Sequence, residues 1–307
     1  MIWPLLLTPA ALLAAPVLLT PLRERLTPRE LAPTGGFVTI DGHEVHFSDT
    51  GPDAAPAVML VHGFAASTFT WRAQIAALGA AGYRAIAVDL LGYGASARPA
   101  AAVYATDQQA RIVLGVADAL ALPRFALVGH SFGGRVALQL ALLAPERVTA
   151  LAAICPEALA LTRPPIGALA ALPLVGQALS FYLLAPGLVS TGLRALSVRH
   201  EWLTAEAAAG YAAPLTVRGT AAAQVWQARS PKDGSVPVPT ALEQIACPTL
   251  LLWGDRDTVF PVDHGRQIAQ RIPAARLEVF HDVGHLPHEE CADEVSTALL
   301  GWLAGLQ

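Results

Sequence analysis

The sequence contains few cysteines, and their number and spacing argue against two kinds of stabilised fold. Only three occur among 307 residues, at Cys155, Cys247 and Cys291, and no two form a C-x-x-C pair. An odd number of widely spaced cysteines argues against a disulfide framework and against a zinc site, so we expect buried free thiols. No H-E-x-x-H or H-x-x-E-H pattern occurs among the histidines, and we expect no metal.

Charge is also scarce. Charged side chains make up 14% of the chain, and the formal net charge at pH 7 is −4. No cluster of lysine and arginine could neutralise a phosphate backbone, so we expect no nucleic-acid partner. Hydrophobic residues, in contrast, make up 54% of the chain, enough for a sizeable core. The length fits one large α/β domain or a core with an inserted subdomain.

The first 22 residues carry no charged side chain, and the stretch from Ile2 to Leu19 is almost wholly apolar. A helix of this length would cross most of a hydrocarbon core of about 30 Å. Arg23, Arg25 and Arg29 follow it, and the positive-inside rule then keeps the remaining chain on the cytoplasmic side. We expect residues 2–20 to associate with a membrane, as an uncleaved anchor or as an interfacial helix.

Two other interpretations of this segment stay open. A signal peptide would export the protein, although the segment lacks a basic start and an A-x-A cleavage site. A helix packed on the folded domain is the other alternative. The sequence does not distinguish a spanning helix from one lying on the membrane.

The chain then alternates between strand and helix patterns. Asp41-Gly42 between two short apolar runs predicts a β-hairpin. Further strands are expected at 57–61, 84–88, 125–128, 148–154, 249–253 and 276–280. Helical spacing separates most of them, which predicts a mostly parallel sheet with helices on both faces.

This alternation stops between residues 156 and 239, where prolines separate apolar helical segments at 169–184, 188–196 and 205–213. We interpret this region as a helical cap inserted into the core. The expected division is a membrane segment and linker at 1–34, a first core part at 35–156, the cap at 157–239 and a second core part at 240–307.

The segment Gly129–Gly133 reads G-x-S-x-G and stands between a buried strand and an amphipathic helix. This is the context of a nucleophile elbow, a tight turn that holds Ser131 above the sheet edge. Gly129 and Gly133 would remove the side chains that clash in such a turn. The amide of Phe132 and the helix dipole could then face a developing oxyanion.

Four polar residues follow expected strand ends, where active sites of parallel sheets lie: His62, Ser131, Asp257 and His285. With the motifs around them, the chain resembles the α/β-hydrolase superfamily over roughly residues 35–306, in its serine-hydrolase branch. The motifs are His62-Gly63-Phe64, Asp89 to Ser96, the elbow, Gly254 to Asp257, and Gly284 to Glu290. The resemblance implies an eight-stranded, mostly parallel sheet with an inserted cap.

The resemblance also implies roles for these residues. Ser131 would be the nucleophile, His285 its base and Asp257 the acid that orients the imidazole. The amides of Phe64 and Phe132 would form the oxyanion hole. Asp255 is the alternative acid, while His281 and His288 flank the same loop as His285. His62 and Gly63 would support the turn after the strand at 57–61, and His130 would pack beneath the elbow. His46, with no motif around it, is expected at the surface or in a loop.

A serine at the elbow argues against the aspartate-dependent branches of the family, the haloalkane dehalogenases and epoxide hydrolases. We therefore expect an esterase or lipase acting on a small hydrophobic ester, without a cofactor. The apolar cap and N-terminus are similar to membrane-anchored monoacylglycerol-lipase-like hydrolases. The alternatives are a meta-cleavage carbon–carbon hydrolase, which Arg163, Arg194, Arg199 and Arg218 of the cap would suit, and a receptor or scaffold. The sequence does not indicate the oligomeric state.

Overall fold

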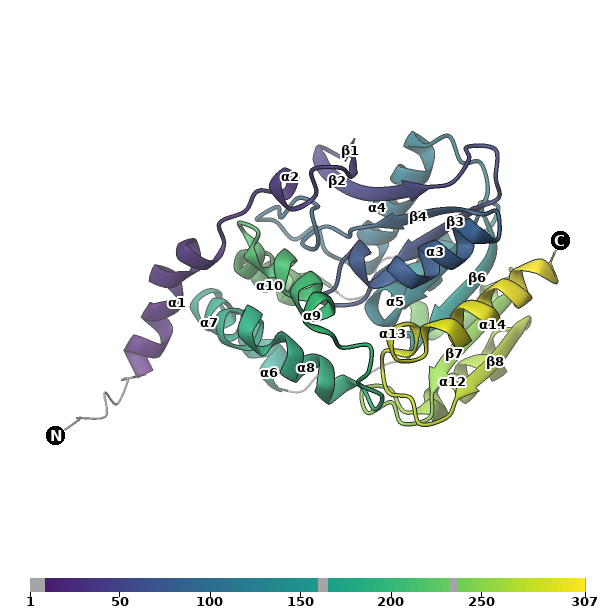
Figure 1. Ribbon diagram of the computed structural model, residues 1–307. Coiled ribbons are helices and arrows are strands. Elements are labelled where there is room, and N and C mark those ends of the chain that lie inside the picture. Colours follow the sequence, from purple (N-terminus) through teal and green to yellow (C-terminus); the bar gives the residue numbers. More distant parts are fainter. Residues whose placement is uncertain (1–8, 160–164, 232–236, 307) are drawn as a thin grey trace.

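The computed structural model describes residues 9–159, 165–231 and 237–306 (Figure 1). One eight-stranded sheet forms its centre, in the order β1-β2-β4-β3-β5-β6-β7-β8. The strands are β1 (Gly36–Ile40), β2 (His43–Thr50), β3 (Ala57–Val61), β4 (Arg84–Val88), β5 (Phe125–His130), β6 (Val148–Ile154), β7 (Thr249–Gly254) and β8 (Ala275–Phe280). Only the β1–β2 and β2–β4 pairs are antiparallel. The predicted fold class is confirmed.

The predicted hairpin joins β1 to β2 through a two-residue turn. Asp41 and Gly42 have φ of 49° and 79°, the left-handed values that such a turn requires. Ile40 then pairs with His43, and the register places the buried Val45 opposite Val38.

Helices cover both faces of the sheet. Helices α3 (Arg72–Ala80) and α14 (Ala292–Ala304) pack together on one face, and α4 (Thr106–Ala119) and α5 (Ser131–Leu143) pack together on the other (Figure 1). Helix α12 (Val262–Arg271) lies beside β7 and β8. The central strands β3, β4, β5 and β7 are buried along their whole length, because helices cover both of their faces.

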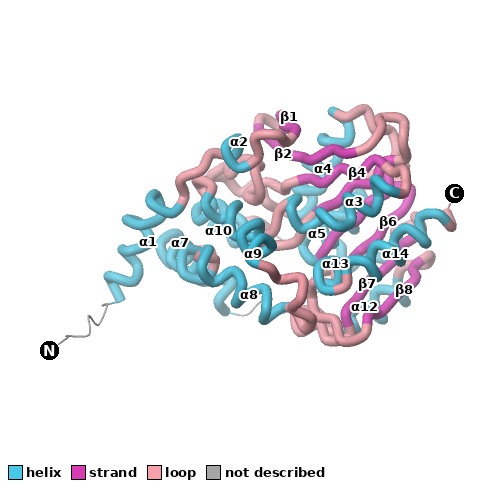
Figure 2. Tube along the Cα trace, viewed as in Figure 1, coloured by secondary structure: helices cyan, strands magenta, loops and turns pink. Residues whose placement is uncertain are grey.

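Between β6 and β7 the chain leaves the sheet, and over its described residues there it forms helices and loops without a strand (Figure 2). The helices are α6 (Pro165–Ala170), α7 (Pro173–Leu183), α8 (Val189–Leu196), α9 (Ala205–Ala212), α10 (Thr220–Arg229) and the short α11 (Val238–Ala241). The expected single helix at 169–184 is wrong. It is divided before Pro173, whose ring disfavours the helical conformation for Leu172. Helix α10 was not predicted.

The N-terminal helix α1 (Pro9–Arg23) packs against α7 of the cap. Directly after it, the buried Glu24 accepts hydrogen bonds from the amides of Gly219 and Ala221 at the start of α10, both at 2.8 Å. Helix α2 (Pro28–Leu31) follows within the expected linker. The chain after α1 is therefore fastened to the cap.

The predicted membrane segment falls only partly within this description, because residues 2–8 lie outside the described residues. Among the described helices, none is by itself both long and apolar enough to cross a membrane. Pro173–Leu183 and Pro186–Leu196 meet that criterion only when taken together, and they are bent by 50° relative to each other.

Candidate active site

Ser131 stands at the junction of β5 and α5 in the strained geometry expected of an elbow. Its φ is 51°, in the left-handed region that non-glycine residues rarely adopt. A Cβ on Gly129 would collide with the carbonyl oxygen of Gly133, and a Cβ on Gly133 would collide with the carbonyls of Val61 and His62. Both glycines therefore allow β5, α5 and the end of β3 to approach closely beneath the serine.

The structure brings the three predicted triad residues together from three separate strand ends. The Nε2 atom of His285 lies 3.0 Å from Ser131 Oγ, and its Nδ1 atom lies 2.8 Å from Asp257 Oδ2. All three residues are buried, with exposed fractions of 8% or less. The chain of hydrogen bonds can move a proton from the hydroxyl to the imidazole while the carboxylate fixes the ring.

Asp257 is held as a carboxylate. Burial opposes its ionisation, but the hydrogen bond and charge of His285 and the amides of Val259 and Phe260 outweigh burial and lower its pKa. Those two amides donate to Oδ1 at 2.8 and 2.9 Å, leaving Oδ2 for His285. The alternative acid, Asp255, contacts the exposed His281 instead, at 2.7 Å.

The two predicted oxyanion donors come from the elbow itself and from the turn after β3. The Phe132 amide belongs to the first turn of α5, where amides lack an intrahelical acceptor. Phe64 follows Gly63, at which a Cβ would come within 2.7 Å of His130 Nδ1. Glycine at position 63 thus allows the turn after β3 to lie against the elbow. The ring of Tyr93 contacts both phenylalanines, with centroids 6.0 and 6.5 Å away.

The remaining histidines near the site support its loops. His62 donates from Nδ1 to the Gly63 carbonyl at 2.8 Å and accepts the Leu90 amide on Nε2 at 3.1 Å. His130 donates from Nε2 to the carbonyl oxygen of His285 at 2.9 Å. Burial, followed by the charge of His285, lowers the pKa of His130 to about 3. Burial also lowers the pKa of His288 well below its usual value. Both are therefore poor proton acceptors.

Two groups of described side chains have the spacing of a metal site: the exposed Asp255, His281 and Asp282, and a buried group at the triad. Single ligand atoms of Cys155, Asp257 and His285 lie within 4.8 Å of one another. A thiol binds metal as the thiolate, and burial raises the pKa of Cys155 well above its ordinary value. Asp257 and His285 are in addition bonded to each other, so these residues fit a proton relay better than a metal.

Comparison with known proteins assigns the chain to a family. Residues 56–292 match the family model described as the alpha/beta hydrolase fold. The chain belongs to the α/β-hydrolase family. Epoxide hydrolase A of Mycobacterium tuberculosis is 28% identical over 321 residues, which cover 90% of this chain and 99% of the relative.

Two solved structures are similar to this α/β hydrolase. A membrane phospholipase A is 27% identical, with a TM-score of 0.74 over 98% of this chain and 93% of that protein. A thermophilic esterase from Thermogutta terrifontis is also 27% identical, with a TM-score of 0.73 over 89% of this chain and 99% of the esterase. The family and these two structures indicate that the protein is a hydrolase, but they do not identify its substrate.

Sequence reasoning gave no role to Glu290, which supports the histidine loop of this α/β hydrolase. Its buried carboxylate accepts the amides of Gly284 and Leu286, on both sides of His285, at 3.0 and 3.1 Å. It also accepts the amides of Val198 and Arg199, which follow α8 of the cap, at 2.6 and 3.0 Å. One side chain therefore positions the loop and joins it to the cap. A glutamate five residues after the histidine was its only sequence signal.

We predict that Glu290→Gln lowers kcat about tenfold while changing KM less. The amide offers one acceptor oxygen to four amides, so the His285 loop loses its fixed position, and the free energy of unfolding falls by about 1–3 kcal/mol. Steady-state kinetics and urea unfolding measure both effects. Glu294→Gln, which removes an exposed partner of Arg199, is the control. A Glu290 variant that unfolds more easily but keeps its kcat would show that the residue does not position the histidine.

The expectation that His46 lies at the surface or in a loop is wrong. The residue is 5% exposed on β2, and its Nδ1 atom donates to the buried Asp89 at 2.7 Å. Asp89 also accepts the amides of Thr68 and Ala95 at 2.7 and 2.8 Å. Burial opposes ionisation of Asp89, but the hydrogen bond and charge of His46, the charge of His62 and the Ala95 amide outweigh burial and lower its pKa. The predicted surface histidine is thus part of the support for the loops after β3 and β4.

Two cavities meet at Ser131, and Phe64, Leu183, Leu184 and Val259 line both. The first, about 330 Å³, has His285 on its wall and extends under α8, and we call it the His285 arm. The second, about 560 Å³, extends between α7 and α10, and we call it the α10 arm. Phe64, Leu183 and Val259 are 56%, 62% and 39% exposed, so apolar side chains surround the shared entrance.

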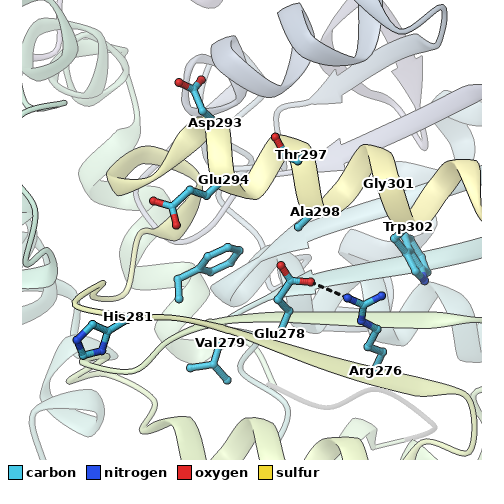
Figure 3. A pocket seen from close by; sticks show the side chains of 11 residues that line it. Arg276, Glu278, Val279, His281, Asp293, Glu294, Thr297, Ala298, Gly301 and Trp302 are labelled. Atoms are coloured by element: carbon cyan, nitrogen blue, oxygen red, sulfur yellow. Dashed lines mark hydrogen bonds and ion pairs between the residues drawn. The ribbon is translucent and has the colours of Figure 1, made fainter.

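A further cavity of about 700 Å³ lies between β8 and α14 (Figure 3). Arg276 and Glu278 form an ion pair on β8, while Asp293 and Glu294 extend from α14 above them. None of the predicted site residues lines this cavity. β8 is an edge strand of the sheet, and charged side chains on an edge strand hinder pairing with another strand.

Proposed function

We propose that this α/β hydrolase is a serine hydrolase that cleaves hydrophobic carboxylic esters. The observation that carries the proposal is the continuous hydrogen-bond chain from Ser131 through His285 to Asp257, beneath a cavity with mostly apolar walls. Such walls suit an apolar substrate, with the few polar groups reserved for the reacting bond.

The reaction would proceed in two halves. His285 Nε2 takes the proton of Ser131 as Oγ attacks the ester carbonyl carbon, and the amides of Phe64 and Phe132 hold the resulting oxyanion. The bond between carbon and the alcohol oxygen then breaks, and His285 gives its proton to the departing alcohol. Water, deprotonated by His285, attacks the acyl-enzyme, and the acid leaves as Ser131 recovers its proton.

Three other functions are less well supported. The epoxide hydrolase branch uses an aspartate nucleophile at the elbow, and this chain has Ser131 there. A meta-cleavage hydrolase would need carboxylate-binding groups, and no arginine is found among the described residues that line either arm. Arg199 instead pairs with Glu294, and Arg163 lies outside the described residues. A receptor or scaffold would not need the geometry of the triad.

The test is hydrolysis of p-nitrophenyl esters from acetate to palmitate, together with labelling by a fluorophosphonate. We expect hydrolysis with an optimum above acetate and stoichiometric labelling. Labelling without hydrolysis of any ester would favour the carbon–carbon hydrolase or the receptor. A folded protein that is not labelled would refute the serine-hydrolase proposal.

We also propose that residues 2–20 associate with a membrane, with the catalytic part on the cytoplasmic side. Within the described part, Val17, Leu18, Leu19 and Leu22 of α1 are between 43% and 72% exposed. Leucines at the two ends of α7, which packs against α1, are also exposed: Leu172, Leu174 and Leu183. The similar structure of a membrane phospholipase A agrees with such an association. Apolar helical surface of this kind is suited to the boundary between headgroups and acyl chains.

We predict that Leu18→Glu with Leu22→Glu lowers the lipid-bound fraction about tenfold in flotation with anionic vesicles, because two charges would enter the apolar layer. Leu306→Glu, at an exposed leucine near the other end of the chain, is the control. Unchanged flotation of the double variant would contradict the proposal. An intact mass lacking the first 20 or so residues in cells would identify a signal peptide instead.

A further inference from the structure

The two arms differ in which residues of the proposed catalytic site line them. Both have Ser131 on their walls, but only the His285 arm has His285, and only the α10 arm has Phe132. The nucleophile and its base therefore line one arm together, whereas the other arm has the nucleophile without its base.

The tetrahedral intermediate makes this difference meaningful. Its carbon would carry Ser131 Oγ, the oxyanion, the alcohol oxygen and the acyl chain. The alcohol oxygen must come within hydrogen-bond distance of His285 Nε2 in order to receive the proton. Once the two amides hold the oxyanion and the alcohol oxygen faces His285, one position on the carbon remains. The acyl chain occupies it, on the side away from His285.

We propose that the His285 arm binds the alcohol part of the ester and that the α10 arm binds its acyl chain. This assignment rests on the proposed ester hydrolysis and adds the orientation of the substrate to it. It makes the smaller cavity, about 330 Å³, the alcohol site and the larger, about 560 Å³, the acyl site.

The wall of the His285 arm also indicates the class of alcohol. Apolar side chains, leucines foremost, form most of it, and its polar side chains already have protein partners. Tyr211 donates to Glu289 at 2.7 Å, and Thr70 Oγ1 lies 2.5 Å from the Tyr211 hydroxyl and 2.8 Å from His288 Nε2. Hydroxyl groups of a polyol would lose water there without gaining partners. The site therefore favours alkyl or aryl alcohols over glycerol.

Two substitutions separate the arms. Gly192 lies on α8 in the wall of the His285 arm, and a Cβ there would meet no atom within 4 Å. Leu188 and Leu196, one turn before and after it, line the same arm, so we expect Gly192→Leu to narrow the arm without a backbone clash while replacing a helical glycine. Ala228 of α10 lines the other arm, and Ala228→Leu is the matched change. Gly192→Ala and Ala228→Val are milder replacements should either leucine variant fold poorly.

The assay uses two series of esters. In the first, the acyl part is acetate and the alcohol varies: ethyl acetate, hexyl acetate and glyceryl monoacetate. In the second, the alcohol is ethanol and the acyl part varies: ethyl acetate, ethyl hexanoate and ethyl decanoate. We expect Gly192→Leu to lower kcat/KM for hexyl acetate about tenfold or more and to spare ethyl hexanoate. Ala228→Leu should do the reverse. The wild type should prefer hexyl acetate to glyceryl monoacetate.

The opposite pattern in the two variants would overturn the orientation, as would equal losses on both series. A wild type that prefers glyceryl monoacetate would overturn the apolar alcohol site. These failures are distinct from failure of ester hydrolysis itself. In that case the wild type would cleave neither series, and both proposals would be refuted.

Discussion

Ser131→Ala should lower kcat by a factor on the order of 10⁴ to 10⁶ and abolish fluorophosphonate labelling. The hydroxyl of Ser131 lies where the two arms meet and within 3.0 Å of His285 Nε2, so its loss removes the group that would form the acyl-enzyme. The fold should remain intact, since the change removes one hydroxyl group, whose side-chain hydrogen bond is made to His285. Activity on p-nitrophenyl butyrate and intact-protein mass after labelling measure the two effects.

Ser296→Ala is the matched control, because Ser296 is buried in α14 away from both arms. It should retain wild-type kcat and labelling. If Ser131→Ala kept more than about one per cent of the activity, the acyl-enzyme on this residue would be refuted. Thermal unfolding of both variants excludes loss of folded protein as the cause.

The sheet could be predicted from the sequence because two kinds of local pattern identify its strands. Buried parallel strands appear as continuous apolar runs, and the Asp41-Gly42 turn defines the antiparallel hairpin. The elbow was visible because its steric demands require glycine at fixed positions. Local patterns of this kind carry their structural reason in a few neighbouring residues.

The cap was less predictable for a physical reason. Its helices are apolar on several sides, since they face the core, the arms and exposed surface, so spacing alone did not reveal α10 or the break at Pro173. The contacts of Glu290, and of His46 with Asp89, join residues distant in sequence. No periodicity reports such contacts, because they depend on how the loops and strands come together.

Asp257→Asn should lower kcat about 10⁴-fold at neutral pH, with a smaller change in KM. The carboxylate accepts the Nδ1 proton of His285 at 2.8 Å and stabilises the imidazolium that forms during attack. An amide at this position would offer either a neutral oxygen or an N–H group, and the N–H favours the wrong imidazole tautomer. The amides of Val259 and Phe260 still find the remaining oxygen, so we expect the variant to fold.

Asp255→Asn provides a control two residues away in the same loop. Its carboxylate, 26% exposed, pairs with His281, whose side chain is 83% exposed, so the pair lies at the surface and lines neither arm. An exposed pair of this kind contributes little to stability, about 0–1 kcal/mol, and we expect kcat within about twofold of wild type. If Asp255→Asn were the inactive variant and Asp257→Asn the active one, His285 would have to turn toward the outer carboxylate. The 2.8 Å contact with Asp257 would then not be the catalytic arrangement.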